Sequence, residues 1–226
     1  MEQKRNKDSL DKGIIAQYLI SEFEMLHQRA EAHERFIANK TNFFVGLTTA
    51  TLGGLLFLLK ESVGVIASLS ITVVGFFALI FLLIVGWVIF KQSVDMVASA
   101  AIYYRRAGRV RRWFVDNAPS VEKYIPFTVT DERPLLYVPY APLRDFNTIV
   151  ASVNAGLMAI LGNFILFIGA FHKLSLELSI RLMIVMGLIL FGAMFYLQFR
   201  VYKTHLVAKE QSEKERGKVH FPQSDT

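Results

Sequence analysis

Five arginines stand within eight consecutive positions near the middle of this 226-residue chain, and they form its densest group of side chains with a single sign of charge. Guanidinium groups bind phosphate through paired hydrogen bonds, so the cluster could bind an anionic ligand. It could equally hold the chain at an anionic lipid surface, where the neighbouring aromatic side chains suit the interface. We expect lipid headgroups rather than nucleic acid as the direct ligand. The residues are Arg105, Arg106, Arg109, Arg111 and Arg112.

Catalysis is not expected from the remaining polar residues. The sequence contains no nucleotide-binding, metalloprotease, hydrolase, kinase or deaminase motif. The arginines have no accompanying set of carboxylates, and the chain has no cysteine for a disulfide, a thiolate site or a nucleophile. Glu24 and His27 have the spacing of a carboxylate-bridged metal site, but no second such motif accompanies them. We therefore predict a protein that is not an enzyme and that uses no cofactor or metal.

Four long apolar segments must position these side chains. They cover residues 42–59, 64–90, 149–171 and 178–199 in a chain that is 53% hydrophobic, with a mean hydropathy of +0.38. A helix rises about 1.5 Å per residue and the hydrocarbon core of a bilayer is roughly 30 Å thick, so each segment is long enough to cross it. The sequence therefore predicts an all-α membrane protein with four transmembrane helices.

Basic residues are distributed unevenly between the two ends of these helices. Seven Lys and Arg precede the first segment, nine lie between the second and third, and six follow the fourth, against three at the opposite ends. Flanks rich in Lys and Arg remain in the cytoplasm. We therefore expect both termini and the central connection to be cytoplasmic.

This topology divides the chain into five segments. Residues 1–41 form a cytoplasmic amphipathic helix, whose apolar positions follow the helical period from Ile15 to Ile37. Residues 42–90 form the first transmembrane hairpin, 91–148 the cytoplasmic connection, 149–199 the second hairpin and 200–226 a cytoplasmic tail. The amphipathic helix could pack on other cytoplasmic segments of the same chain or against copies of itself.

The cytoplasmic connection has a helical part and a Pro-rich part. The helical pattern of the second segment continues through the arginines to about residue 114, whereas five of the six prolines stand between 115 and 146. Two strand-like pieces, 124–130 and 135–140, could pair as an edge-type β-hairpin that docks a partner or ligand. The alternative is a rigid extended connector that lies over the helix ends.

Inside the apolar segments the informative side chains are small or weakly polar. Asp, Glu, Lys and Arg are confined to the segment ends, which argues against a proton pump or an ion-coupled transporter. Asn154 and Asn163 should avoid lipid, either by hydrogen-bonding between helices or by lining a polar path. Small residues form faces on which helices can approach closely, within one bundle or between subunits. These faces comprise Gly46, Ala50 and Gly54 in the first segment, Ser152, Ala155, Ala159, Gly162 and Gly169 in the third, and a less complete set that includes Gly75 and Gly86 in the second.

A charged helix ending in Glu34-Arg35-Phe36 and Asn39-Lys40 runs into an apolar hairpin and then into a further cytoplasmic helix. Over residues 9–115 this layout resembles that of SLATT-type bacterial membrane proteins. Those are small helical effectors proposed to act as pores in conflict and antiphage systems. The resemblance implies a defence-linked effector in the bacterial inner membrane, and it carries over no functional residue. The second hairpin and the Pro-rich part depart from that layout.

Two functions from different classes are compatible with this sequence. The first is a homo-oligomeric pore or membrane-perturbing effector controlled from the cytoplasmic side, lined by Ser, Thr and Asn and gated by apolar constrictions. The second is a non-conducting membrane anchor or scaffold that recruits a soluble cytoplasmic partner through residues 9–40 and 91–146. Both are compatible with an oligomer, so ion flux through a bilayer distinguishes them.

Overall fold

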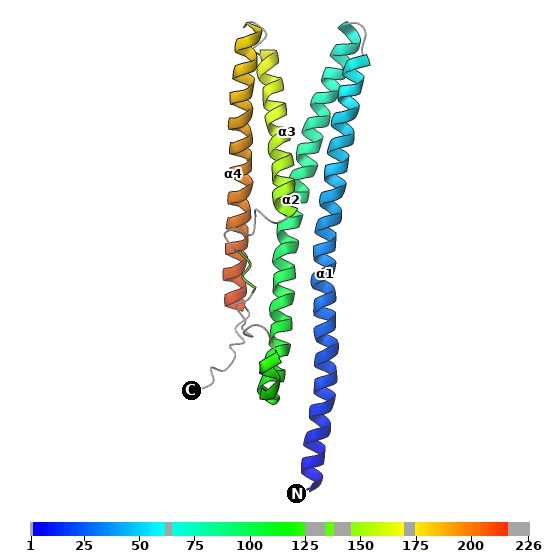
Figure 1. Ribbon diagram of the computed structural model, residues 1–226, viewed down its shortest axis with the longest axis vertical. Helices are drawn as coiled ribbons and strands as arrows, with labels where there is room; N and C mark the ends of the chain where they lie inside the picture. Colours follow the sequence, from blue (N-terminus) through cyan, green and yellow to red (C-terminus); the bar gives the residue numbers. More distant parts are fainter. Residues whose placement is uncertain (1, 62–64, 125–133, 138–145, 170–174, 217–226) are drawn as a thin grey trace. The chain divides into compact units, whose positions relative to one another are not determined.

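The computed structural model describes residues 2–61, 65–124, 134–137, 146–169 and 175–216 (Figure 1). Four long helices account for most of them: α1 (Glu2–Glu61), α2 (Val65–Asn117), α3 (Phe146–Gly169) and α4 (Leu176–Arg216). A short 3₁₀-helix, η1 (Pro119–Tyr124), follows α2. Within this described part there is no strand, and each long helix contains a segment that is long and apolar enough to cross a membrane. The predicted helical class is confirmed, and the four helices are consistent with an integral membrane protein.

Three of the helices join an apolar segment to a charged one without interruption. The sequence has no proline between residues 2 and 61, so the predicted amphipathic helix and the first apolar segment form a single α1 of 60 residues. The α2 helix ends at Asn117 because Pro119 disfavours helical backbone at Ala118. Its last turn is closed by the Asn117 side chain, which donates a hydrogen bond to the Trp113 carbonyl at 2.9 Å.

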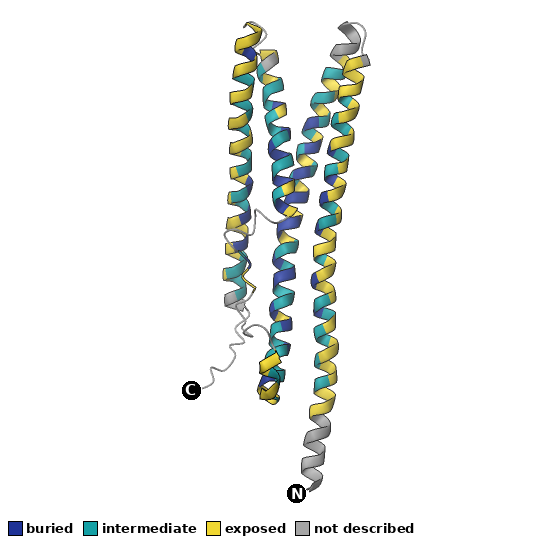
Figure 2. Ribbon diagram, in the orientation of Figure 1, coloured by how far each residue is buried: buried dark blue, intermediate teal, exposed yellow. Residues whose placement is uncertain are grey.

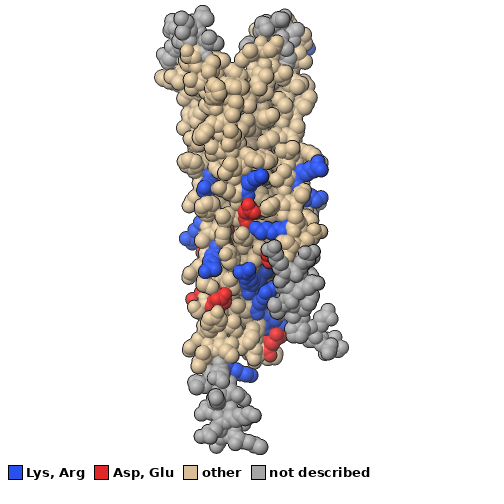
Figure 3. All heavy atoms as spheres, turned by 180° about the vertical axis from the view of Figure 1, so that it is seen from behind, with Lys and Arg blue, Asp and Glu red and all other residues tan. Residues whose placement is uncertain are grey.

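The chain forms two compact units, each assembled from separate segments. We call Met1–Phe36, Asp95–Tyr137 and Leu206–Thr226 the charged unit, and Ile37–Val94 with Val138–His205 the apolar unit. Helices α1, α2 and α4 contribute to both units, whereas α3 belongs to the apolar unit alone. On the face seen in Figure 3, acidic and basic side chains are concentrated on one part, and a broad area carries neither.

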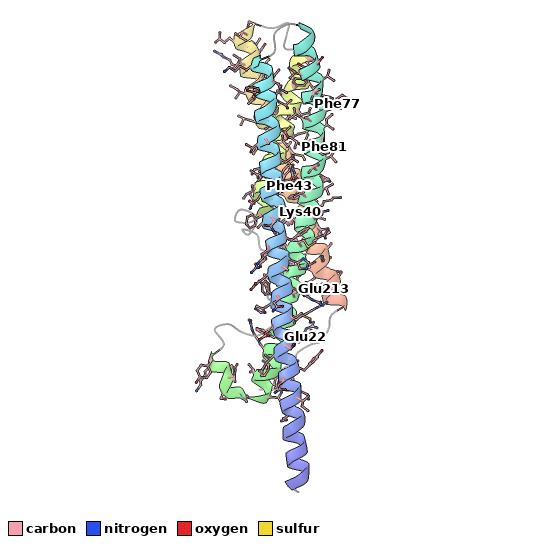
Figure 4. All side chains as sticks on the ribbon, turned by 90° about the vertical axis from the view of Figure 1, so that its right-hand side faces the viewer. Glu22, Lys40, Phe43, Phe77, Phe81 and Glu213 are labelled. Carbon is pink, nitrogen blue, oxygen red and sulfur yellow. The ribbon has the colours of Figure 1, made fainter. Side chains whose placement is uncertain are left out.

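The apolar unit has a core of large side chains and an apolar exterior. Figure 2 marks the buried and exposed positions along its helices. Phe44 of α1, Leu82 of α2 and Leu157 of α3 are almost completely buried. Large apolar side chains also cover much of the outside, as the labelled Phe77 and Phe81 of α2 illustrate (Figure 4). An exterior of this kind is suited to a hydrocarbon environment rather than to water.

The charged unit is held together by apolar contacts between α1 and α2. Leu26 packs against Ala107 and Val110 at its centre. Partly buried side chains surround them: Leu19, Phe23, Tyr103 and Phe114. Pro134–Tyr137 also belong to this unit and form no strand; the rest of the two predicted strand-like pieces, apart from Tyr124 in η1, lies outside the described residues.

Candidate functional site

Asn154 lies in the core of the apolar unit and is fully buried. Its Nδ2 donates a hydrogen bond to Gln198 Oε1 at 3.2 Å, and Gln198 Nε2 donates to the Ala151 carbonyl at 3.4 Å. The network joins α3 to α4. Hydrogen bonds between membrane helices are worth about 0.6 to 2 kcal/mol each.

Asn154 also contacts α2, at a glycine. A Cβ atom on Gly86 would overlap Asn154 Oδ1 and would lie only 2.5 Å from Cζ of Phe44 on α1. Asn154 Oδ1 has no hydrogen-bond partner among the described residues, so the oxygen rests against the Gly86 backbone. Gly86 thus allows α1, α2 and α3 to meet closely at one level.

The small residues of α3 make contacts within the apolar unit. Ala155 is fully buried, and a Cβ on Gly162 would overlap the Leu190 side chain of α4. Asn163 lies against another glycine of α4, since its Nδ2 would be 2.8 Å from a Cβ on Gly187. The remaining members of this face are Ser152 and Ala159, which are half-buried, and Gly169, which is exposed.

The small residues of α1 lie on the opposite side of their helix from its buried residues. Phe44 and Thr48 are buried, whereas Gly46, Ala50 and Gly54 are exposed. No described atom outside the local helix comes within 4 Å of a Cβ placed on Gly46 or Gly54. We call Gly46, Ala50 and Gly54 the α1 small face, and the described residues leave it uncovered.

The five predicted arginines do not share one surface. Arg105 is buried beside α4, where its Nη2 donates to both carboxylate oxygens of Glu210, at 2.8 and 2.7 Å. Arg111 instead lies over the Phe23 ring of α1, 5.0 Å from its centroid, and burial lowers its pKa from the ordinary value. These two arginines therefore serve packing between helices.

The other three arginines are partly or fully exposed. Arg112 pairs with Asp116 one turn along α2, at 2.9 Å, and Arg106 lies over the Tyr103 ring at 5.9 Å from its centroid. Arg109 is half-buried. An anion could reach Arg106 without disturbing the unit, but the cluster does not present five guanidinium groups to one ligand.

Arg105 and Glu210 also hold part of the Pro-rich connection. Arg105 Nε donates to the Pro134 carbonyl at 2.9 Å, and the backbone N–H of Leu136 donates to Glu210 Oε2 at 3.1 Å. The Leu136 side chain is buried. We call this arrangement of Arg105, Glu210, Pro134 and Leu136 the Arg105 clamp. Sequence reasoning missed Glu210, because no periodic pattern connects residues 105 positions apart.

Aromatic and histidine side chains link α1 to α2 elsewhere in the charged unit. Tyr104 donates a hydrogen bond to Glu34 Oε1 at 3.0 Å, and burial together with this carboxylate raises the pKa of Tyr104. His27 lies between Phe23 and Tyr104, with ring centroids 4.5 and 5.5 Å away. The cluster fixes the rotation of α1 against α2.

Together these features define a class: a helical protein with four helices able to cross a membrane and a separate charged unit. Comparison of the chain with profiles of known protein families, with curated proteins and with solved structures gives no match.

Proposed function

We propose that this protein is an oligomeric integral membrane protein that forms a pore, or otherwise permeabilises the membrane, under the control of its cytoplasmic part. The observation that carries the proposal is the uncovered α1 small face. In lipid, faces of small residues stabilise helix contacts because they allow another backbone to approach closely. A second copy of the chain supplies that helix.

The conducting path lies between copies rather than inside one chain. Within the apolar unit Asn154 and Gln198 hydrogen-bond to each other, and Gly86 and Phe44 pack against the Asn154 side chain. Large buried side chains such as Leu82 and Leu157 occupy the core around them. A water-filled passage through the chain itself would have to break these contacts.

Control by the charged unit follows from the charge distribution and the continuous helices. The unequal numbers of Lys and Arg support a topology in which this unit is cytoplasmic. Helices α1, α2 and α4 each run without a break from the charged unit into the apolar unit. A signal that moves the charged unit is therefore transmitted directly to the transmembrane helices. The resemblance to SLATT-type effectors supports a role in antiphage defence at the bacterial inner membrane.

Ion release from liposomes tests the proposal. The full chain, reconstituted at increasing ratios of protein to lipid, should release an ion entrapped in the liposomes. Gly46→Leu and Gly54→Leu should lower this release, and they should also lower the mass of the detergent-solubilised oligomer. Gly192→Leu on α4 is the matched control, because its Cβ position is equally open. Oligomers that release no ion would overturn the pore. Unchanged mass and release in both α1 variants would exclude the small face as the contact.

Exposed apolar side chains at the start of α1 favour the alternative function, a non-conducting anchor that recruits a soluble cytoplasmic protein. Ile14 is 59% exposed and Tyr18 67% exposed, although both belong to the charged unit. Such side chains are suited to binding a partner. Specific binding that is lost in an Ile14→Ser, Tyr18→Ser variant, together with an absence of ion release, would establish the anchor in place of the pore.

A further inference from the structure

A shallow groove in the apolar unit lies where α2, α3 and α4 meet, and its wall exposes almost entirely apolar atoms. Asn147 and Tyr202 also line it, and both side chains are almost completely buried. The groove thus combines an apolar wall with an amide and a hydroxyl group. The apolar side chains of the wall are Phe90 of α2, Ala151 of α3, and Phe195 and Phe199 of α4.

The groove stands at one end of the predicted spans. Phe90 and Phe199 are the last residues of the second and fourth apolar segments, and Asn147 precedes the third. Beside Phe90 on α2, the Trp87 ring centroid is 6.1 Å from that of Phe90, and Lys91 Nζ lies 5.9 Å from the Trp87 ring centroid. Tryptophan and lysine side chains are typical of the headgroup level of a bilayer. The groove therefore extends from the headgroup level into the level of the acyl chains.

Basic side chains follow the aromatic lining residues of α4. Arg200 comes directly after Phe199, Lys203 comes directly after Tyr202, and both basic residues are exposed. Because they are three residues apart on one helix, their side chains are neighbours on its surface. Two positive charges thus stand beside the groove at the headgroup level.

The acidic residues of the apolar unit lie elsewhere. In the part of this unit that the structure describes they are Glu61 and Glu177, which follow the first apolar segment and precede the fourth. Both therefore stand at the ends of the predicted spans opposite to the groove. The described charges on the groove side are basic, and basic pockets between membrane helices bind anionic lipid headgroups.

We propose that this groove binds an anionic phospholipid, with one acyl chain along the aromatic wall and the phosphate between Arg200 and Lys203. The groove is open on one side, so a chain can lie along it without being enclosed. A guanidinium group binds phosphate through paired hydrogen bonds, and an ammonium group adds a point charge. Asn147 and Tyr202 provide an amide and a hydroxyl group at the level of the lipid ester groups. This binding does not depend on ion conduction or on contacts between copies of the chain.

Photocross-linking tests the position of the acyl chain. The full chain is reconstituted in phosphatidylcholine vesicles that contain a small fraction of phosphatidylglycerol with a diazirine in its acyl chain. Cross-links located by mass spectrometry should be enriched in residues 146–151 and 195–202 relative to the exposed surfaces around Phe77 and Leu188. The same diazirine chain on phosphatidylcholine should show several-fold less enrichment. Equal enrichment with both lipids, or labelling spread evenly over the exterior, would overturn the site.

The double variant Arg200→Gln, Lys203→Gln tests the phosphate contacts. Both side chains are exposed, so the variant should fold like wild type, whereas enrichment of the phosphatidylglycerol cross-links should fall several-fold. Arg181→Gln is the matched control, because Arg181 is an exposed cation at the other end of the same span. Wild-type enrichment in the double variant, or an equal loss in Arg181→Gln, would overturn the assignment of the phosphate to Arg200 and Lys203.

A larger side chain in the groove tests the wall. Ala151→Leu should displace the acyl chain and lower the cross-linking of residues 195–202, whereas Gly192→Leu, where the space is open, should leave it unchanged. Thr148 also lines the groove and is only half-buried, so Thr148→Leu provides the same test if Ala151→Leu does not fold. Wild-type cross-linking in a folded variant with a filled groove would show that the acyl chain lies elsewhere.

Discussion

At Gly86 the side chains of Phe44 on α1 and Asn154 on α3 lie against α2, so the lack of a side chain at this residue decides how the three helices pack. In Gly86→Ala the new methyl group would overlap Asn154 Oδ1 and the Phe44 ring. Overpacking of this kind costs about 1 to 3 kcal/mol. We expect a lower unfolding midpoint in detergent, whereas Gly192→Ala on α4, where the space is open, should unfold no more easily than wild type. Equal midpoints for both variants would show that α3 is not packed on Gly86.

Tyr104 provides a prediction that depends on pH. Its hydroxyl donates to Glu34, and Tyr104→Phe should lower the free energy of unfolding by about 1 kcal/mol at neutral pH. Burial and Glu34 raise the folded pKa above the value of about 10 in the unfolded chain. The stabilisation is therefore complete below pH of about 10 and is lost as pH rises through the folded pKa.

Denaturant unfolding of wild type and Tyr104→Phe between neutral and strongly alkaline pH measures this effect. The difference between the two proteins should shrink at the alkaline end. Tyr18→Phe serves as the control. The Tyr18 side chain is largely exposed, so removing its hydroxyl should leave the free energy of unfolding unchanged across this pH range. A difference that grows with pH would contradict the assigned direction of the pKa shift.

Individual contacts were the least predictable part of the molecule. Residue type alone indicated that Asn154 and Asn163 should avoid lipid, because an amide has no partner there. Their neighbours depend on the rotation of one helix against another, so the sequence did not identify Gln198 as a hydrogen-bond partner. Gly86 was recognisable only as one member of an incomplete stripe of small residues.

At the scale of elements, the Arg105 clamp ties α2, α4 and the described part of the Pro-rich connection together. Glu210→Gln would leave a buried guanidinium without its carboxylate. Breaking a buried ion pair lowers the free energy of unfolding by about 3 to 5 kcal/mol. Because both Arg105 and Glu210 keep a small exposed fraction, we expect a loss of about 3 kcal/mol in Glu210→Gln. The Leu136 amide should then exchange its hydrogen faster, because its acceptor is weakened.

Hydrogen–deuterium exchange followed by mass spectrometry measures this loss of protection over residues 134–137. Glu213→Gln, on the same helix, is the control and should leave the exchange of that segment unchanged (Figure 4). Wild-type protection of Leu136 in the Glu210→Gln protein would show that the clamp does not hold the connection.

The helices themselves could be predicted because their causes are local. Long apolar runs, helical spacing and the position of Pro119 explain the extents of α1 and α2. The same local period could not show that Arg105 and Arg111 contact different helices. That outcome depends on which helix packs on each side of α2, and this is a property of the tertiary structure.

At the scale of the whole molecule, the topology is the first prediction to test. Reporter fusions after Asn117 and after Thr226 should both give a cytoplasmic signal, because 22 of the 25 Lys and Arg flank that side of the four predicted spans. A reporter inserted after Ser62, in the first short connection, should give the external signal. A reversed pattern would place the charged unit outside the cell and would remove cytoplasmic control from the proposed mechanism.

The assembly of the charged unit from three separate segments has a consequence for biosynthesis. Arg105 emerges from the ribosome well before Glu210, since 105 positions separate them, and α3 and most of α4 are made in between. The clamp can close only after the chain has been made as far as Glu210 of α4. Until then Arg105 lacks its carboxylate and the Leu136 amide lacks its acceptor. Closure of the clamp therefore follows the synthesis of α4, and only then does the 134–137 segment gain its contact with that helix.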